Sequence, residues 1–143
     1  RYFLCFVKQY FYGKKEKDTG VLRQERNLRM FDIWLTLWER GTCLVDWLIA
    51  QEIYSVAVYG AGYLGRHLIA ELRDSPVNMA YIIDRSVVKM NVECHIYRLG
   101  DKLPEVDAII VTPVGQYDNI RRSLSDYTKC RTISLEHILT ELI

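Results

Sequence analysis

Residues 54–65 read YSVAVYGAGYLG, and this stretch decides the fold. Residues 54–59 form a short, mostly apolar run with β-branched members, which is typical of a strand buried in a parallel sheet. Three glycines follow directly, and apolar residues at three- and four-residue steps then run over residues 63–73, which predicts a helix. A strand, a glycine turn and a helix in this order predict the start of an α/β fold.

The same alternation continues to the end of the chain. The segment 74–76 contains Pro76 and is expected to end the first helix. Further strands are predicted at 79–83, 94–97, 108–111 and 131–134, and further helices at 119–127 and 135–142. The pattern predicts a three-layer αβα domain over residues 53–143, with a parallel sheet of about five strands in the order 3-2-1-4-5.

Residues 1–52 lack this alternation and are rich in aromatic residues, so we expect a helical extension before the α/β domain. A helix over residues 21–40 is predicted from an apolar face at helical spacing, formed by Leu28, Phe31, Leu35 and Trp38 with Trp34 beside them. Gly41 ends this helix, and Thr42 is expected to cap a second one that runs to Glu52. The apolar face is expected to pack on the core, and the alternatives are a sheet edge or a dimer contact.

Composition is that of an ordinary globular domain, with 50% hydrophobic and 26% charged residues among 143. The formal net charge of +1 gives no general attraction to nucleic acid or to an anionic membrane. No apolar run is long enough to span a bilayer, and no signal peptide is recognisable, so we expect a cytoplasmic protein. The 4 cysteines contain no Cys-x-x-Cys pair, which favours reduced thiols and no metal site.

The glycine loop consists of Gly60, Ala61, Gly62, Tyr63, Leu64 and Gly65. It matches a Gly-x-Gly-x-x-Gly pattern and lies where that pattern has a mechanism, between a predicted strand and a predicted helix. Gly60 permits a tight turn, Gly62 lets the backbone approach a pyrophosphate, and Gly65 lets the helix pack closely on the strand. We therefore expect the amides of residues 62–64 to bind a nucleotide phosphate. The alternative is a glycine turn that serves packing alone.

Asp84 ends the second predicted strand, 24 residues after Gly60, which is close to the offset of about 20 residues expected for a ribose-binding acid in such folds. A carboxylate there accepts hydrogen bonds from both ribose hydroxyls and repels a 2′-phosphate, which favours NAD over NADP. Arg85 is the next residue in the sequence. Under an alternative interpretation its guanidinium pairs with a ligand phosphate, which would weaken the preference for NAD. The simpler alternative is that Asp84 only ends a strand.

Thr112 and Pro113 follow the fourth predicted strand and are expected at the carboxyl edge of the sheet, where ligands bind in open α/β folds. Thr112 offers a hydroxyl group, and Gly115 lets the chain pass close to a ligand. An ordinary strand-to-helix turn explains the same residues. Arg66 and His67 open the helix after the loop and are expected to be exposed, and the alternative is that they contact a bound anion. No nucleophile elbow and no P-loop occurs, so no catalytic residue is predicted.

With these motifs identified, residues 53–143 resemble the Rossmann-like nucleotide-binding domains of bacterial surface-polysaccharide biosynthesis proteins. These include domains attached to sugar-nucleotide dehydratases and the N-terminal domains of sugar O-acyltransferases. The resemblance lies in the segments 60–66, 83–84, 106–112 and 133–138. It implies a fold and a nucleotide or sugar-nucleotide pocket rather than one activity, because residues 62–65 differ from the Gly-Gly-His-type loop of the acyltransferases.

The sequence thus favours an accessory module that binds NAD or a nucleotide sugar in polysaccharide biosynthesis, without complete catalytic machinery of its own. Two alternatives stay open: the cofactor-binding part of an NAD-dependent oxidoreductase or epimerase, and a structural scaffold with an empty pocket. The expected partner is a small-molecule nucleotide, with no nucleic acid and no membrane span. Residues 1–52 are expected to form a homodimer contact or to meet an upstream domain.

Overall fold

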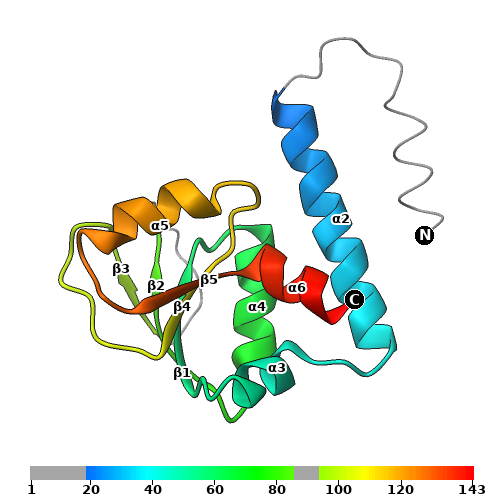
Figure 1. Cartoon of the computed structure of the whole chain (residues 1–143), viewed down its shortest axis with the longest axis horizontal. Helices are drawn as coiled ribbons and strands as arrows, with labels where there is room; N and C mark the ends of the chain where they lie inside the picture. Colours follow the sequence, from blue (N-terminus) through cyan, green and yellow to red (C-terminus); the bar gives the residue numbers. More distant parts are fainter. Residues whose placement is uncertain (1–18, 86–93) are drawn as a thin grey trace.

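A parallel β-sheet forms the centre of the chain in the computed structural model, which describes residues 19–85 and 94–143. Its strands lie in the order β3-β2-β1-β4-β5 (Figure 1), as the sequence predicted. They are β1 (Ser55–Tyr59), β2 (Asn78–Ile83), β3 (His95–Tyr97), β4 (Ala108–Val111) and β5 (Arg131–Ser134). The first part of the predicted N-terminal extension, residues 1–18, lies outside the described residues.

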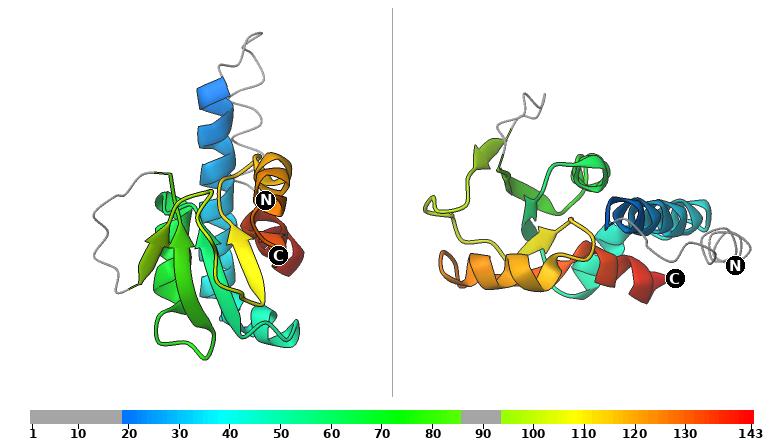
Figure 2. Two further views of the ribbon diagram at one scale, coloured as in Figure 1. Left: turned by 90° about the vertical axis from the view of Figure 1, so that its left-hand side faces the viewer. Right: turned by 90° about the horizontal axis from the view of Figure 1, so that it is seen from above.

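Helices cover both faces of this sheet. They are α2 (Thr19–Glu39), α3 (Leu44–Ala50), α4 (Tyr63–Leu72), α5 (Tyr117–Ser125) and α6 (Leu135–Leu142). Figure 2 shows α4 and α5 on opposite faces of the sheet. The buried residues of α2 and α6 belong to the same core as those of α4. The helix predicted over 119–127 begins earlier, at Tyr117. No helix in the described part of the chain is long and apolar enough to cross a bilayer.

The side chains of β1 divide the interior into two cores, because successive residues of a strand point to opposite faces of a sheet. Val56 and Val58 belong to the core under α2, α4 and α6, whereas Ala57 and Tyr59 belong to the core under α5. The first core also takes in buried residues from the N-terminal helices, namely Met30, Ile33, Leu37, Leu44, Val45 and Leu48. The helices α2 and α3 therefore share one hydrophobic core with the sheet.

The prediction of which face of α2 is buried was wrong. The structure exposes three members of the predicted face, with exposed fractions of 52% for Leu28, 59% for Leu35 and 76% for Trp38. The buried residues are instead Met30, Ile33 and Leu37. They also recur at three- and four-residue steps, so two apolar stripes run along one helix. Periodicity predicts a helix from either stripe but does not decide which of them meets the sheet.

The predicted cap of the second helix was also wrong. The residue before α3 is Cys43 rather than Thr42, and its side chain makes no capping hydrogen bond. The amide of Leu44 donates instead to Glu71 Oε1 on α4, at 2.7 Å. Glu71 also accepts from the Trp34 indole at 2.7 Å and from Cys43 Sγ at 3.1 Å. One carboxylate therefore connects α2, α3 and α4.

Candidate functional site

The glycine loop lies at the carboxyl edge of the sheet, where β1 ends and α4 begins. Gly60 has φ of +89°, a conformation that favours glycine. A Cβ at Gly60 would also lie 2.8 Å from Thr112 Oγ1. Its amide donates to the carbonyl of Ile83 at 2.9 Å, so the turn is tied to β2. Glycine at position 60 is therefore required by the fold itself.

Gly65 is required for a different reason, which is close packing. It is buried in the first turn of α4. A Cβ there would overlap the carbonyl oxygen of Gly60 and lie 2.9 Å from its carbonyl carbon. Both are backbone atoms, so they cannot move aside as a flexible side chain would. The role predicted for Gly65, close contact between helix and strand, matches this geometry.

The fold does not require glycine at position 62. Its φ of −70° is open to any residue, and a Cβ would meet no atom within 4 Å. It is the N-cap of α4, makes no side-chain capping bond, and is followed by no acidic residue in the first turn. The amides that open a helix have no partner within the helix and lie at its positive end. Glycine at position 62 therefore leaves open space in front of these donors.

Asp84 lies beside the loop, as the spacing predicted. It follows β2 directly, and its Oδ2 accepts a hydrogen bond from the amide of Ala61 at 2.8 Å. Its own amide donates to the carbonyl of Tyr97 at 3.0 Å, which fixes the backbone at the end of β3. The side chain is half-buried, and the neighbouring Arg85 is exposed. The carboxylate and the loop are thus held together as one unit.

Thr112 holds the other side of the loop. Its side chain is 4% exposed, and its hydroxyl donates toward the carbonyls of Tyr59 at 2.9 Å and Gly60 at 2.8 Å. The hydroxyl proton is therefore directed at the end of β1, where it fixes the turn. The next residue, Pro113, packs on the same turn, since a Cβ at Gly60 would lie 3.1 Å from its ring.

A cavity of about 220 Å³ opens in front of the glycine loop and Thr112, and the predicted site residues Ala61, Asp84 and Arg85 are not among the residues that line it. Its walls come from the glycine loop, from the segment after β4 and from α2: Gly60, Gly62, Tyr63, Leu64, Gly65, Thr112, Pro113, Val114, Gln116, Arg23 and Asn27. The contribution of Arg23 and Asn27 was not foreseen from the sequence. Their spacing of one helical turn places them on a common face, but only the docking of α2 brings that face to the loop.

Arg66 and His67 do not line this cavity. The His67 ring packs against the rings of Phe31 and Trp34, with centroids 5.5 and 6.3 Å apart. The Arg66 guanidinium lies 5.2 Å from the centre of the Tyr63 ring. Both side chains are exposed, as expected.

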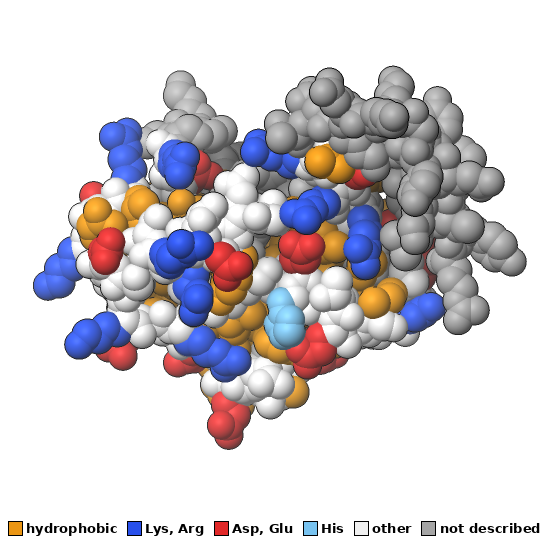
Figure 3. All heavy atoms as spheres, turned by 45° about the horizontal axis from the view of Figure 1, so that its top comes forward, with side chains coloured by type: hydrophobic (Ala, Val, Ile, Leu, Met, Phe, Trp, Pro, Cys, Tyr) orange, Lys and Arg blue, Asp and Glu red, His pale blue; other side chains and the backbone are white. Residues whose placement is uncertain are grey.

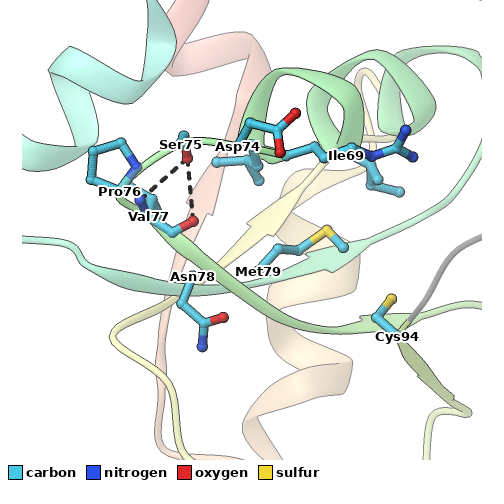
Figure 4. A pocket seen from close by; sticks show the side chains of 10 residues that line it. Ile69, Asp74, Ser75, Pro76, Val77, Asn78, Met79 and Cys94 are labelled. Carbon is cyan, nitrogen blue, oxygen red and sulfur yellow. Dashed lines mark hydrogen bonds between the residues drawn. The ribbon is translucent and has the colours of Figure 1, made fainter.

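A larger hollow of about 680 Å³ lies at the opposite, amino-terminal edge of the sheet (Figure 4). It is bordered by the turn after α4, where the Ser75 hydroxyl bonds the backbone of Val77, and by Cys94 before β3. Ligands of open α/β sheets bind at the carboxyl edge. The position of this hollow therefore separates it from the glycine loop.

The surface carries charges of both signs (Figure 3). Lysine and arginine side chains alternate with carboxylates over the face shown, in keeping with the formal net charge of +1. Within residues 19–85 and 94–143, no group of three or more His, Cys, Asp and Glu side chains is placed to hold a metal ion.

Compared with known proteins, the chain matches no family model, no curated protein and no solved structure. The case for a function therefore depends on the loop, the carboxylate and the cavity. These three features lie together at the one edge of the sheet where such folds place their ligands.

Proposed function

We propose that the chain binds a nucleotide, either NAD or a nucleotide sugar, at the glycine loop. The observation that carries this proposal is the geometry of Gly62, where the fold leaves room for a side chain and the sequence has none. A phosphate occupies that room and accepts hydrogen bonds from the amides of residues 62–64. The positive end of the α4 dipole adds to the attraction.

Asp84 holds the ribose in this proposal. Its hydrogen bond to the amide of Ala61 supports the assignment, because it fixes the carboxylate next to the phosphate-binding turn. Ribose hydroxyls then join as further donors to the same carboxylate, which accepts several hydrogen bonds. A 2′-phosphate would meet a like charge, so NAD is preferred over NADP.

The module acts by binding rather than by acid–base chemistry of its own. Among the described residues that line the cavity there is no Asp, Glu, His, Lys or Cys side chain, and Tyr63 is the lining side chain of a type that can act as a general acid or base. A complete acid–base pair would need a further group from outside this lining. The resemblance of residues 53–143 to polysaccharide-biosynthesis domains supports an accessory role in that process. An oxidoreductase or epimerase role would need catalytic residues from another part of the protein or from a partner.

Removing the Asp84 carboxylate is expected to weaken nucleotide binding about 10-fold or more, since charge-assisted hydrogen bonds to ribose are lost. The measurement is a calorimetric titration with NAD, NADP, UDP-sugars, CDP-sugars and coenzyme A. Asp84→Asn is the closer variant, because its amide oxygen still accepts from the amide of Ala61, and Asp84→Ala removes both interactions. Asp126→Asn, exposed at the end of α5, is the matched control. Unchanged affinity in both Asp84 variants would remove this residue from the site.

An apolar stripe of α2 supports a second role, which is self-association: Leu28, Leu35 and Trp38 are exposed, and Phe31 is half-buried against the core. Leu28, Phe31, Leu35 and Trp38 are spaced symmetrically about residue 33. In an antiparallel pair of copies, Leu28 therefore lies opposite the partner's Trp38, and Phe31 lies opposite the partner's Leu35. Each leucine faces an aromatic ring, which suits interdigitated packing. A second copy of this chain is thus the partner that the stripe fits.

The 143-residue chain is expected to sediment as a dimer at micromolar concentration, and the double variant Leu35→Ser/Trp38→Ser as a monomer. Both side chains are more than half exposed in the single chain, so their loss should leave the monomer folded, and the melting temperature should fall only by the contribution of dimer formation. Leu22→Ser is the control, since Leu22 is also exposed on α2 but lies outside the stripe. A wild-type chain that sediments as a monomer would contradict self-association.

A further inference from the structure

A cavity of about 720 Å³ lies between α2, the turn that leads to α3, and α4. Its walls include an aliphatic side chain, four rings and one carboxylate, namely Leu35, Phe31, Trp34, Trp38, His67 and Glu71. None of its lining residues also lines the cavity at the glycine loop. The volume falls within the roughly 300–1,000 Å³ of small-molecule sites. This cavity therefore has room for a ligand of its own.

The rings at this cavity are held at fixed angles to one another. The His67 ring meets that of Phe31 at an interplanar angle of 85° and that of Trp34 at 72°, both in edge-to-face contacts. Trp38 is 76% exposed, so its ring is open to a ligand. The faces of aromatic rings carry negative partial charge and attract cations. The cavity therefore has the kind of wall on which organic cations bind.

Glu71 gives the cavity its charge. The side chain is half-buried, and the described lining contains no lysine or arginine to balance it. Its Oε1 accepts hydrogen bonds from the Leu44 amide and Cys43 Sγ, and its Oε2 accepts one from the Trp34 indole. All these donors are neutral, so they hold the carboxylate in place without removing its charge. A carboxylate has about four acceptor positions, which leaves one for a further donor.

We propose that this cavity binds a small organic cation, in which an alkylated ammonium group is joined to an apolar or aromatic body. Glu71 attracts the positive charge, the rings contact the alkyl groups on the nitrogen, and Leu35 covers the apolar body. An alkylated ammonium is more weakly hydrated than a lysine-type ammonium, so it enters such a cavity at a lower desolvation cost. An anion of the same shape meets the carboxylate as a like charge. This inference is independent of nucleotide binding and goes beyond it.

The cavity overlaps the stripe of α2 that is proposed for self-association. Phe31, Leu35 and Trp38 belong to both, whereas Leu28 belongs to the stripe alone. A second copy and a bound cation therefore exclude one another. Leu28→Ser removes a contact between copies and leaves every lining residue of the cavity in place, so this variant keeps the cavity open for measurement.

The test is a calorimetric titration of the wild-type 143-residue chain and of Leu28→Ser with three probes. They are the cation benzyltrimethylammonium, the neutral benzyl alcohol and the anion phenylmethanesulfonate. The cation is expected to bind about 10-fold more tightly than the neutral probe, and the anion more weakly than both. Leu28→Ser is expected to bind the cation at least as tightly as the wild type, because no second copy competes.

Two variants, each made in the Leu28→Ser chain, separate the rings from the charge. Trp38→Leu should weaken cation binding about 5-fold and leave the affinity for the neutral probe within about 2-fold. Tyr54→Leu is its matched control, since Tyr54 is also an exposed ring but lies outside the cavity. Glu71→Gln should remove the preference for the cation, and Glu39→Gln, at the exposed end of α2, should retain it. Thermal unfolding checks each fold, and the exposed position of Trp38 keeps the test decisive if Glu71→Gln is unstable.

The outcomes distinguish a cation site from the other occupants of this cavity. A preference for the cation that is weakened in Trp38→Leu and lost in Glu71→Gln supports the proposal, whether or not the wild type forms a dimer. Equal affinity of Leu28→Ser for the cation and the neutral probe overturns it. A dimeric wild type whose Leu28→Ser variant binds no probe shows that the cavity accepts a second copy only, which also overturns it. No nucleotide is present in these titrations, so failure of the proposed nucleotide binding leaves each result unchanged.

Discussion

Gly65→Ala is expected to lower the free energy of unfolding by about 2–4 kcal/mol, since the added methyl group overlaps the backbone of Gly60. The helix α4 and the end of β1 must then separate. Both elements contribute to the same core, through Val58, Leu64 and Leu68 among others, so the separation also loosens packing. Urea unfolding of the variant and the wild type measures the difference.

Gly62→Ala is the matched control, and it separates stability from binding. Its Cβ meets no protein atom and its φ is ordinary, so the free energy of unfolding should change by less than about 0.5 kcal/mol. The small loss from placing alanine at an N-cap is offset by the reduced freedom of the unfolded chain. Nucleotide affinity should nevertheless fall about 10-fold, because the methyl group occupies the place of the phosphate. Equal stability losses in the two variants would contradict the geometry described for this loop.

Glu71→Ala is expected to destabilise the fold by about 2–4 kcal/mol, since it removes the acceptor of three hydrogen bonds from three different residues. The Trp34 indole and the Leu44 amide then lose their partners in a partly buried place, and such unsatisfied donors are costly. The measurement is again urea unfolding. Glu39→Ala, at the exposed end of α2, is the control and should change stability by less than about 0.5 kcal/mol. A loss in Glu71→Ala no larger than in this control would contradict the linking role of Glu71.

The reactivity of the Cys43 thiol gives an independent test of the hydrogen bonds that Glu71 accepts. Burial raises the pKa of the Cys43 thiol, and the hydrogen bond and the charge of Glu71 raise it further. A raised pKa means that less thiolate is present at pH 8, and the thiolate is the form that reacts. Glu71→Ala should therefore lower the pKa of Cys43 toward its ordinary value and speed its alkylation, measured by peptide mapping of the labelled protein. An unchanged alkylation rate would show that Glu71 does not act on this thiol.

Local signals made the core of the fold predictable. The strand at residues 55–59, the glycine turn and the helix after it are neighbours in the sequence, and each carries a strong pattern of its own. The orientation of α2 was not predictable in this way, because its two apolar stripes have the same spacing. The start of α3 was missed because the acceptor for the Leu44 amide comes from Glu71, on another helix. Such long-range contacts leave no trace in a local pattern.

In the candidate site, too, local sequence patterns predicted some features, while others depend on long-range contacts. The placement of Gly60, Gly65 and Asp84 around the turn was predictable from their spacing, since a motif with a mechanism fixes where its members lie relative to a strand and a helix. Thr112 was expected at this edge, but the direction of its hydroxyl toward the end of β1 depends on tertiary packing. Arg23 and Asn27 were missed altogether, because their approach to the loop depends on how α2 docks.

The most direct test of nucleotide binding at the glycine loop is an NMR titration of the backbone amides with NAD and with a UDP-sugar. Hydrogen bonds to phosphate oxygens should shift the amide signals of Gly62, Tyr63 and Leu64 strongly, and those near Asp84 more weakly. Saturable shifts of this pattern with either ligand are the result that this account predicts. Signals of residues 62–64 that stay in place with both ligands, or shifts confined to the hollow beside Ser75 and Cys94, would contradict it.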